Sequence, residues 1–208
     1  MNSEQALSHL KRDATLKPLI DSIDIPDFTP SGNVYFALLD SIVSQQLSTK
    51  AAATIFNRFC ALFPENYPHS DLLANMTKEQ LRSVGLSVQK STYLQNVADF
   101  SQQYDLENHR WNEMSDDEIV TFLTQIKGVG IWSAQMVMMF TIGRKDVFPI
   151  GDLGIQQAMI GLFGMDKNDK KLQNKMLECA EPWRPYRTIA SRYLWRWKDG
   201  AMKAKTEG

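Results

Sequence analysis

The chain of 208 residues contains only two cysteines and three histidines. Cys60 and Cys179 lie in helical patterns far apart in the sequence, which is typical of reduced thiols rather than of a disulfide. Because an iron–sulfur cluster needs several cysteine ligands, we expect no such cluster. His9, His69 and His109 do not have the spacing of a zinc pair, so we expect no metal site built from side chains.

The chain also lacks long apolar runs and a strong net charge. No run approaches the ~18 apolar residues of a membrane span, and the first residues lack the apolar core of a signal peptide. We therefore expect a soluble, cytoplasmic protein that does not bind membranes. The net charge of −1 argues against a protein that coats nucleic acid by bulk charge.

Basic residues are nevertheless concentrated near the C-terminus. Between residues 184 and 205 there are seven of them against one acid, Asp199. They are Arg184, Arg187, Arg192, Arg196, Lys198, Lys203 and Lys205. Two interpretations stay open, a helix with a solvated basic face and a surface that binds phosphates.

Apolar residues recur at helical spacing along the chain, for example over 34–43, and nothing alternates with period two for long enough to form a strand. Thr77 with Gln80, and Ser115 with Glu118, have the spacing of helix capping boxes. The sequence therefore predicts an all-α fold of about ten helices.

The most informative stretch begins with Gly128 and Gly130, which flank Val129 directly after an apolar helical pattern. Glycine permits positive φ and close approach of a ligand to the backbone. The pattern predicts a helix over 131–140, whose first-turn N–H groups would point back at the glycines and could bind a phosphate. A Gly-x-Gly pair alone is more often simple turn chemistry.

One helix length later comes the loop 149–152, which ends in Asp152. By residue type alone, Asp152 is expected to cap a helix that starts at Leu153. A cap would also hold its carboxylate rigidly. The other nearby acid, Asp146, follows an arginine and a lysine, and a solvated ion pair accounts for it.

Together with three further segments, these motifs resemble the helix-hairpin-helix–Gly/Pro–Asp superfamily of DNA glycosylases, with the closest likeness to the 3-methyladenine DNA glycosylase II group. The resemblance covers roughly residues 35–198, and the motifs occur in the family's order. They are Ser44–Ser48, Val84–Ser87, the hairpin Ile126–Gly130, the loop Pro149–Asp152, and Pro182–Arg187.

The resemblance implies an all-α fold of two helical lobes with an active-site cleft between them. Residues 35–138 would form a helical barrel that ends in the helix-hairpin-helix motif. Residues 1–34 and 139–208 would form the second lobe, which carries the catalytic loop. The 34 residues before the barrel leave no room for the N-terminal β-rich domain of some members.

The implied activity is that of a monomeric, monofunctional DNA glycosylase, which excises alkylated purines such as 3-methyladenine and 7-methylguanine from double-stranded DNA in base excision repair. Asp152 would be the catalytic carboxylate beside C1′ of the sugar. Bifunctional relatives carry a lysine two residues beyond the last glycine of the hairpin; this chain has Trp132 there, so no lyase activity is expected. The alternative is a DNA-structure-binding hairpin protein without catalysis, which has no use for Asp152.

The resemblance also implies a pocket for the extruded base. Trp132 would stack on a cationic base, although a core position is its alternative. Met136 stands where some members have an aromatic residue. Among the aromatic residues near the C-terminus we assign Trp195 to this pocket.

DNA contacts are implied at two places. Gln46 would insert through the minor groove, with Gln45 beside it and Leu47 as an apolar wedge; a polar loop between helices is the alternative. Phosphates would bind the hairpin amides and basic side chains. The hairpin residues are Gly128, Val129 and Gly130, and the basic residues are Arg187 and Arg196. No cofactor is required, although the hairpin backbone is a candidate site for a monovalent cation, and in a bacterium the protein would be associated with the nucleoid.

Overall fold

The computed structural model describes the backbone of residues 3–206 and the side chains of residues 3–200. Lys203 and Lys205, counted above among the basic residues, have side chains outside that range. Residues 3–206 contain helices and no strand, which confirms the predicted all-α fold. None of the helices in the described part of the chain is long and apolar enough to cross a membrane.

The chain divides into two compact units. One contains Pro30–Ile142, and the other contains Met1–Thr29 together with Gly143–Gly208. The division therefore falls at Pro30 and Ile142, a few residues outside the expected limits of 35 and 138.

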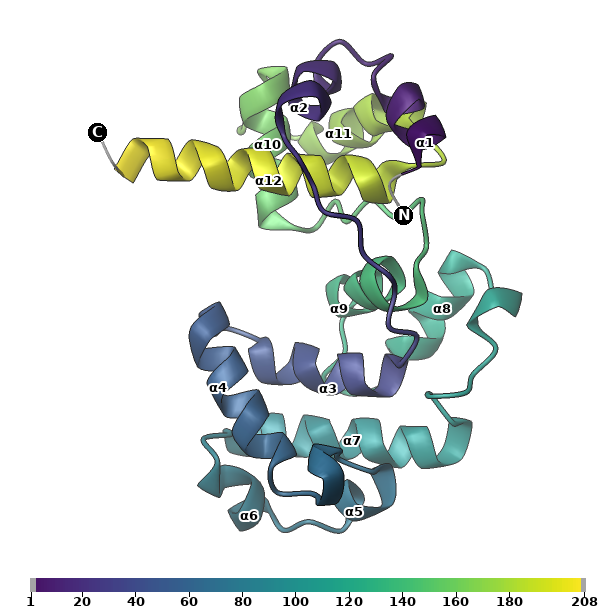
Figure 1. Cartoon of the computed structure of the whole chain (residues 1–208), viewed down its shortest axis with the longest axis vertical. Helices are drawn as coiled ribbons and strands as arrows, with labels where there is room; N and C mark the ends of the chain where they lie inside the picture. Colours follow the sequence, from purple (N-terminus) through teal and green to yellow (C-terminus); the bar gives the residue numbers. More distant parts are fainter. Residues whose placement is uncertain (1–2, 207–208) are drawn as a thin grey trace. The chain divides into compact units, whose positions relative to one another are not determined.

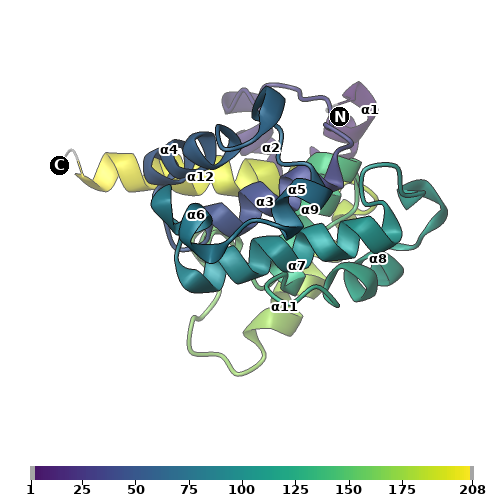
Figure 2. The ribbon, with the colours of Figure 1, turned by 90° about the horizontal axis from the view of Figure 1, so that it is seen from below.

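The unit of Pro30–Ile142 is organised around its longest helix, α7 (Figures 1 and 2). Helix α7 packs against α3, α5 and α6. Leu38 of α3, together with Leu94 and Val97 of α7, is fully buried. The helices of this unit are α3 (Val34–Ser44), α4 (Thr49–Cys60), α5 (Ser70–Ala74), α6 (Lys78–Ser83), α7 (Val88–Tyr104), α8 (Asp116–Leu123) and α9 (Ile131–Val137).

The helix starts follow from local hydrogen bonding. Both predicted capping boxes, Thr77 with Gln80 and Ser115 with Glu118, are confirmed at the starts of α6 and α8. The helix predicted over 131–140 begins as expected at Ile131, but its last part is π-helical, over Met138–Ile142.

The second unit is organised around α12, which packs against α2 and α10 (Figure 1). Its core contains Trp183, which is 1% exposed and whose Nε1–H donates to Asp13 Oδ2 at 2.8 Å. The helices of this unit are α1 (Glu4–Leu10), α2 (Leu16–Ser22), α10 (Leu153–Phe163), α11 (Leu172–Ala180) and α12 (Arg187–Thr206).

Two glycines let α10 and α12 approach closely. A Cβ built on Gly154 would lie 2.9 Å from Trp195 Cδ1, and one on Gly161 would lie 2.7 Å from Trp197 Cη2. Both distances are shorter than real side-chain contacts, so each tryptophan occupies the space that a larger residue on α10 would fill. This packing brings Trp195 to the first turn of α10.

The two cysteines form no disulfide. Cys60 is buried in α4, and Cys179 is half-buried in α11. Burial raises the pKa of the Cys179 thiol to about 11, and burial also raises the pKa of the Cys60 thiol.

Candidate functional site

Asp152 occupies the N-cap of α10, as its sequence context predicts. Its Oδ1 accepts a hydrogen bond from the Ile155 N–H at 2.9 Å. The same oxygen accepts a second one from Trp195 Nε1–H at 2.8 Å. Two donors from different helices therefore fix the orientation of this half-buried carboxylate, at a helix end that stabilises negative charge.

The loop in front of Asp152 is held by its own backbone. The Asp152 N–H donates to the Pro149 carbonyl at 2.9 Å, and the Ile150 N–H donates to the Phe148 carbonyl at 2.9 Å. Gln156, one turn into α10, donates its side-chain N–H to the Ile150 carbonyl at 2.8 Å. The Gly/Pro-rich segment is thus a folded turn that delivers Asp152 to the helix start.

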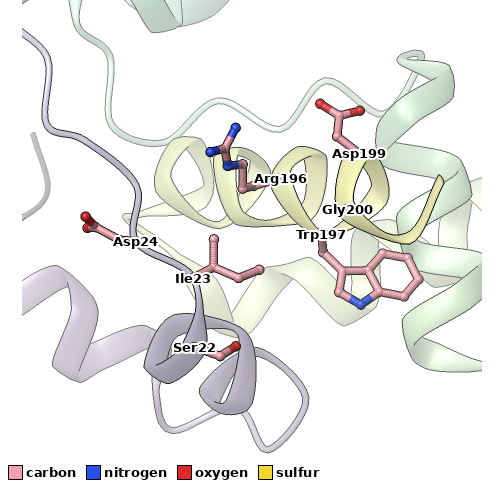
Figure 3. Close-up of a pocket in the computed structure, with 7 residues that line it drawn as sticks. All are labelled: Ser22, Ile23, Asp24, Arg196, Trp197, Asp199 and Gly200. Carbon is pink, nitrogen blue, oxygen red and sulfur yellow. The ribbon is translucent and has the colours of Figure 1, made fainter. Parts of the chain in front are cut away.

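Two surface hollows lie beside α12 in this unit, and Asp152 lines neither of them. The smaller is about 250 Å³ and includes Trp195, Arg192 and Pro26 in its lining. The larger, about 570 Å³, is shown in Figure 3, where Arg196 and Asp199 project from one side of α12 and Trp197 from the other. Arg196 lines both hollows.

The hairpin before α9 requires glycine at one of its two glycine positions. Gly128 has a φ of +110°, and a Cβ there would lie 2.3 Å from Tyr93 Cγ. Gly130 has a φ of −96° and open space around a Cβ. Of the two glycines to which the sequence analysis assigned positive φ or close approach, Gly128 therefore needs both, and Gly130 needs neither.

Gly130 is nevertheless the N-cap of α9, where no side chain caps the helix. Val129 is buried, and its N–H closes the turn by donating to the Ile126 carbonyl at 2.9 Å. The first-turn amides of α9 therefore follow the hairpin directly, which is the arrangement expected of a backbone phosphate site.

The predicted DNA-inserting loop, Gln45–Leu47, contacts this hairpin. Gln45 donates its side-chain N–H to the Gly128 carbonyl at 3.2 Å. Gln46 has a φ of +61° and is exposed, and Leu47 is 38% exposed. Gln45 is thus bound within the protein, while Gln46 and Leu47 form the surface of the loop.

Of the predicted pocket residues, Trp132 and Met136 lie one helical turn apart on α9. Trp132 is 46% exposed, so the alternative of a core position does not apply within its unit. Met136 is half-buried. These two residues belong to the unit of Pro30–Ile142. Trp195 and Asp152, which are in contact, both belong to the other unit.

Arg187 has a different role from the predicted phosphate contact. Its side chain is only 11% exposed, and its Nε donates to Asp146 Oδ1 at 2.7 Å. Its Nη2 donates to Asp146 Oδ2 at 3.0 Å and to the Asp146 carbonyl at 2.9 Å. Arg184 also pairs with Asp146, at 2.6 Å. Because its guanidinium is already bound, Arg187 is a structural residue, and Asp146 pairs with these two arginines.

Arg196, by contrast, is exposed.

Gly154 was not predicted from the sequence as a residue of the site, although its lack of a side chain gives Trp195 access to Asp152. A glycine inside a helical pattern, two residues after the candidate carboxylate, was the available signal, because such a glycine usually has a packing reason. In the described part of the chain, no group of three or more His, Cys, Asp or Glu residues could hold a metal ion.

The sequence pattern of the HhH-GPD superfamily of base excision DNA repair proteins matches residues 39–185. The chain belongs to this superfamily, which confirms the resemblance read from the motifs.

Relatives of the chain are named as 3-methyladenine DNA glycosylases. The chain is 34% identical over 164 residues to DNA-3-methyladenine glycosylase 1 of Schizosaccharomyces pombe, covering 78% of this chain and 71% of that protein. It is 33% identical over 170 residues to YfjP of Bacillus subtilis, whose description as a DNA-3-methyladenine glycosylase is provisional. That match covers 79% of this chain but only 58% of YfjP.

A solved structure is also similar. It is the 3-methyladenine DNA glycosylase Mag1 of S. pombe in complex with abasic DNA, with a TM-score of 0.79 and 31% sequence identity. The similarity covers 92% of this chain and 95% of that one.

The different constraints on the two hairpin glycines can be measured. Gly128→Ala is expected to lower the free energy of unfolding by at least about 1 kcal/mol, because alanine disfavours positive φ and its Cβ meets Tyr93. Gly130→Ala is expected to change it by less than about 1 kcal/mol, because the loss of a favoured N-cap residue is offset by the smaller conformational entropy of alanine in the unfolded chain. Urea denaturation of both variants checks this, and an equal loss for the two would contradict the assignment of the constraint to Gly128.

Proposed function

We propose that this protein is a monofunctional DNA glycosylase that excises alkylated purines from double-stranded DNA. The observation that carries the proposal is the Asp152 carboxylate, held by the Ile155 N–H and the Trp195 indole at the start of α10. The relatives named 3-methyladenine DNA glycosylases support it. Within the proposal, the protein acts as a monomer in the cytoplasm and needs no cofactor for the reaction.

The proposed reaction is hydrolysis of the bond between a base and C1′ of deoxyribose. The C1′–N bond breaks, its electron pair leaves with the base, and positive charge develops on the sugar. Asp152 stabilises that charge and orients the attacking water, whose oxygen bonds to C1′ while its proton is released. The products are the free base and an intact strand with an abasic site.

The chemistry of alkylated purines suits a site with one carboxylate. A base such as 3-methyladenine is cationic while attached to the sugar and leaves as a neutral molecule, so its departure needs no proton from the protein. A cationic base is also attracted to an aromatic face, by about 0.5–2 kcal/mol. The exposed Trp132 is the proposed stacking face, with the flexible Met136 beside it.

The hairpin would bind the DNA backbone through the amides that follow Gly128 and Gly130. Its carbonyls are neutral oxygen ligands, a donor set that also fits a monovalent cation. The carbonyls of Lys127 and Gly128 each accept a side-chain hydrogen bond, and because a carbonyl oxygen has two lone pairs, that bond does not prevent it from binding a cation. Such a cation would add positive charge near a bound phosphate.

Substitution of the carboxylate separates catalysis from binding. Asp152→Asn is expected to bind DNA containing an alkylated base as well as the parent does, but to excise the base at least ~100-fold more slowly, the scale of losing one preorganised charge stabiliser. Release of free base from methylated DNA, identified by chromatography, measures the rate. The matched control is Asp99→Asn, because Asp99 is an exposed carboxylate on α7.

Full activity of Asp152→Asn would contradict the assignment of Asp152 as the catalytic carboxylate. If the parent protein binds DNA but releases no base, the alternative of a non-catalytic DNA-structure-binding protein is favoured instead.

Trp195→Phe keeps an aromatic ring but removes the N–H donor, so an intermediate excision rate is expected if that hydrogen bond orients Asp152.

Lyase chemistry provides a further prediction. Trp132 stands where the resemblance places the lysine of bifunctional relatives, so no amine is available there to form a Schiff base. Borohydride reduction during the reaction is expected to trap no covalent protein–DNA adduct, and the product strand should stay intact until alkali is added. A trapped adduct would show that another lysine acts.

The two arginines of α12 should differ in their effect on DNA binding. Arg196→Ala is expected to lower the slope of log affinity against log salt by about one unit, if Arg196 neutralises one phosphate. Arg187→Ala should instead lower the free energy of unfolding by about 1–3 kcal/mol, because it removes charged hydrogen bonds to Asp146. Equal salt slopes for Arg196→Ala and the parent would return Arg196 to a solvated surface role.

A further inference from the structure

One face of α7 contacts both segments that are proposed to bind DNA in the unit of Pro30–Ile142, the loop Gln45–Leu47 and the hairpin Ile126–Gly130. Lys90, Tyr93 and Asn96 are spaced three residues apart and therefore lie on the same side of the helix. The Lys90 ammonium contacts the loop Gln45–Leu47, and the other two contact the hairpin.

The Lys90 ammonium closes the C-terminal end of α3. It donates to the Val43 carbonyl and to the Gln45 carbonyl, each at 2.7 Å. The last carbonyls of a helix have no partner inside the helix and carry partial negative charge, so an ammonium is favourable there. Burial lowers the pKa of Lys90, which has exchanged part of its hydration for these carbonyls. The chain then turns at Gln46 with a positive φ.

The other two residues hold the hairpin. The Tyr93 ring fills the space in which a side chain at Gly128 would have to lie, and Asn96 donates its side-chain N–H to the Lys127 carbonyl at 3.0 Å. Gln45 joins the two segments, because its carbonyl accepts from Lys90 while its side chain donates to Gly128. The contacts form a closed circuit from α7 to the loop, to the hairpin and back to α7.

We propose that Lys90 is a positioning residue that fixes the loop Gln45–Leu47 in register with the hairpin, so that Gln46 enters the duplex at a set distance from the phosphate bound by the hairpin amides. This inference rests on the proposed function. Extruding a base from a duplex requires unpairing and unstacking, and a preorganised inserting loop favours that step. Lys90 thus acts on extrusion, through the backbone of the loop, and has no part in breaking the glycosidic bond.

Substrates that differ only in pairing test this role. Lys90→Met keeps the aliphatic stem and removes the ammonium. It is expected to slow single-turnover excision of a paired lesion by about tenfold, the scale of losing one charged hydrogen bond, while leaving the rate within about twofold for the same lesion in an unpaired bubble. Lys90→Arg retains a donor and should restore most of the paired rate. The control is Lys78→Met, since Lys78 is exposed on α6 and the substitution removes the same charge.

Equal slowing of Lys90→Met on paired and unpaired lesions would overturn the proposal, because Lys90 would then only support the fold. A rate on the paired lesion that matches Lys78→Met would overturn it as well. If the parent excises neither lesion, the proposed function fails, and the register of the two segments is then decided by a measurement that needs no activity.

That measurement is amide hydrogen exchange. The Leu47 N–H donates to the Ser44 carbonyl at 3.2 Å, and the Val129 N–H donates to the Ile126 carbonyl at 2.9 Å, so each reports on one segment. In Lys90→Met both amides are expected to exchange faster than in the parent, with no change in Lys78→Met. Faster exchange at Leu47 alone would show that loop and hairpin move independently, and the coupling would be rejected.

Discussion

The hydrogen bond from the Trp195 indole to Asp152 depends on how closely two helices pack. Gly154 leaves the space in which the indole lies, and Gly161, two turns later, does the same for Trp197. The buried residues of α10 and α12, among them Ile155 and Leu194, hold the helices at that separation. The position of one carboxylate is therefore a property of the whole hydrophobic core of its unit.

In the unit of Pro30–Ile142, the segments that need to be fixed are a loop and a hairpin. Its loop Gln45–Leu47 and its hairpin are made largely of turns, which on their own would sample many conformations. Polar side chains from one rigid helix, α7, bind their carbonyls and fix them. In the proposed function these backbone atoms recognise DNA, and a regular element behind them keeps them in place.

Much of this architecture is encoded locally and could be predicted. The helices follow the spacing of apolar residues, both capping boxes form, and Asp152 caps its helix. The incorrect predictions concern partners distant in the sequence. Arg187 and Asp146 are 41 residues apart, and no local pattern shows that they pair. Likewise, Gly128 and Gly130 are equivalent as sequence signals, and only the structure shows that Gly128 combines a positive φ with the Tyr93 ring beside it.

The shielded cysteines have a practical consequence. The thiolate is the reactive form of cysteine, and the raised pKa values of Cys60 and Cys179 keep both thiols protonated near neutral pH. A thiol-specific fluorophore would therefore react preferentially with a single cysteine introduced on the surface, for example in place of Gln46. The native chain is thus already suited to site-specific labelling, and motion of its exposed loop could be followed optically without first removing the natural cysteines.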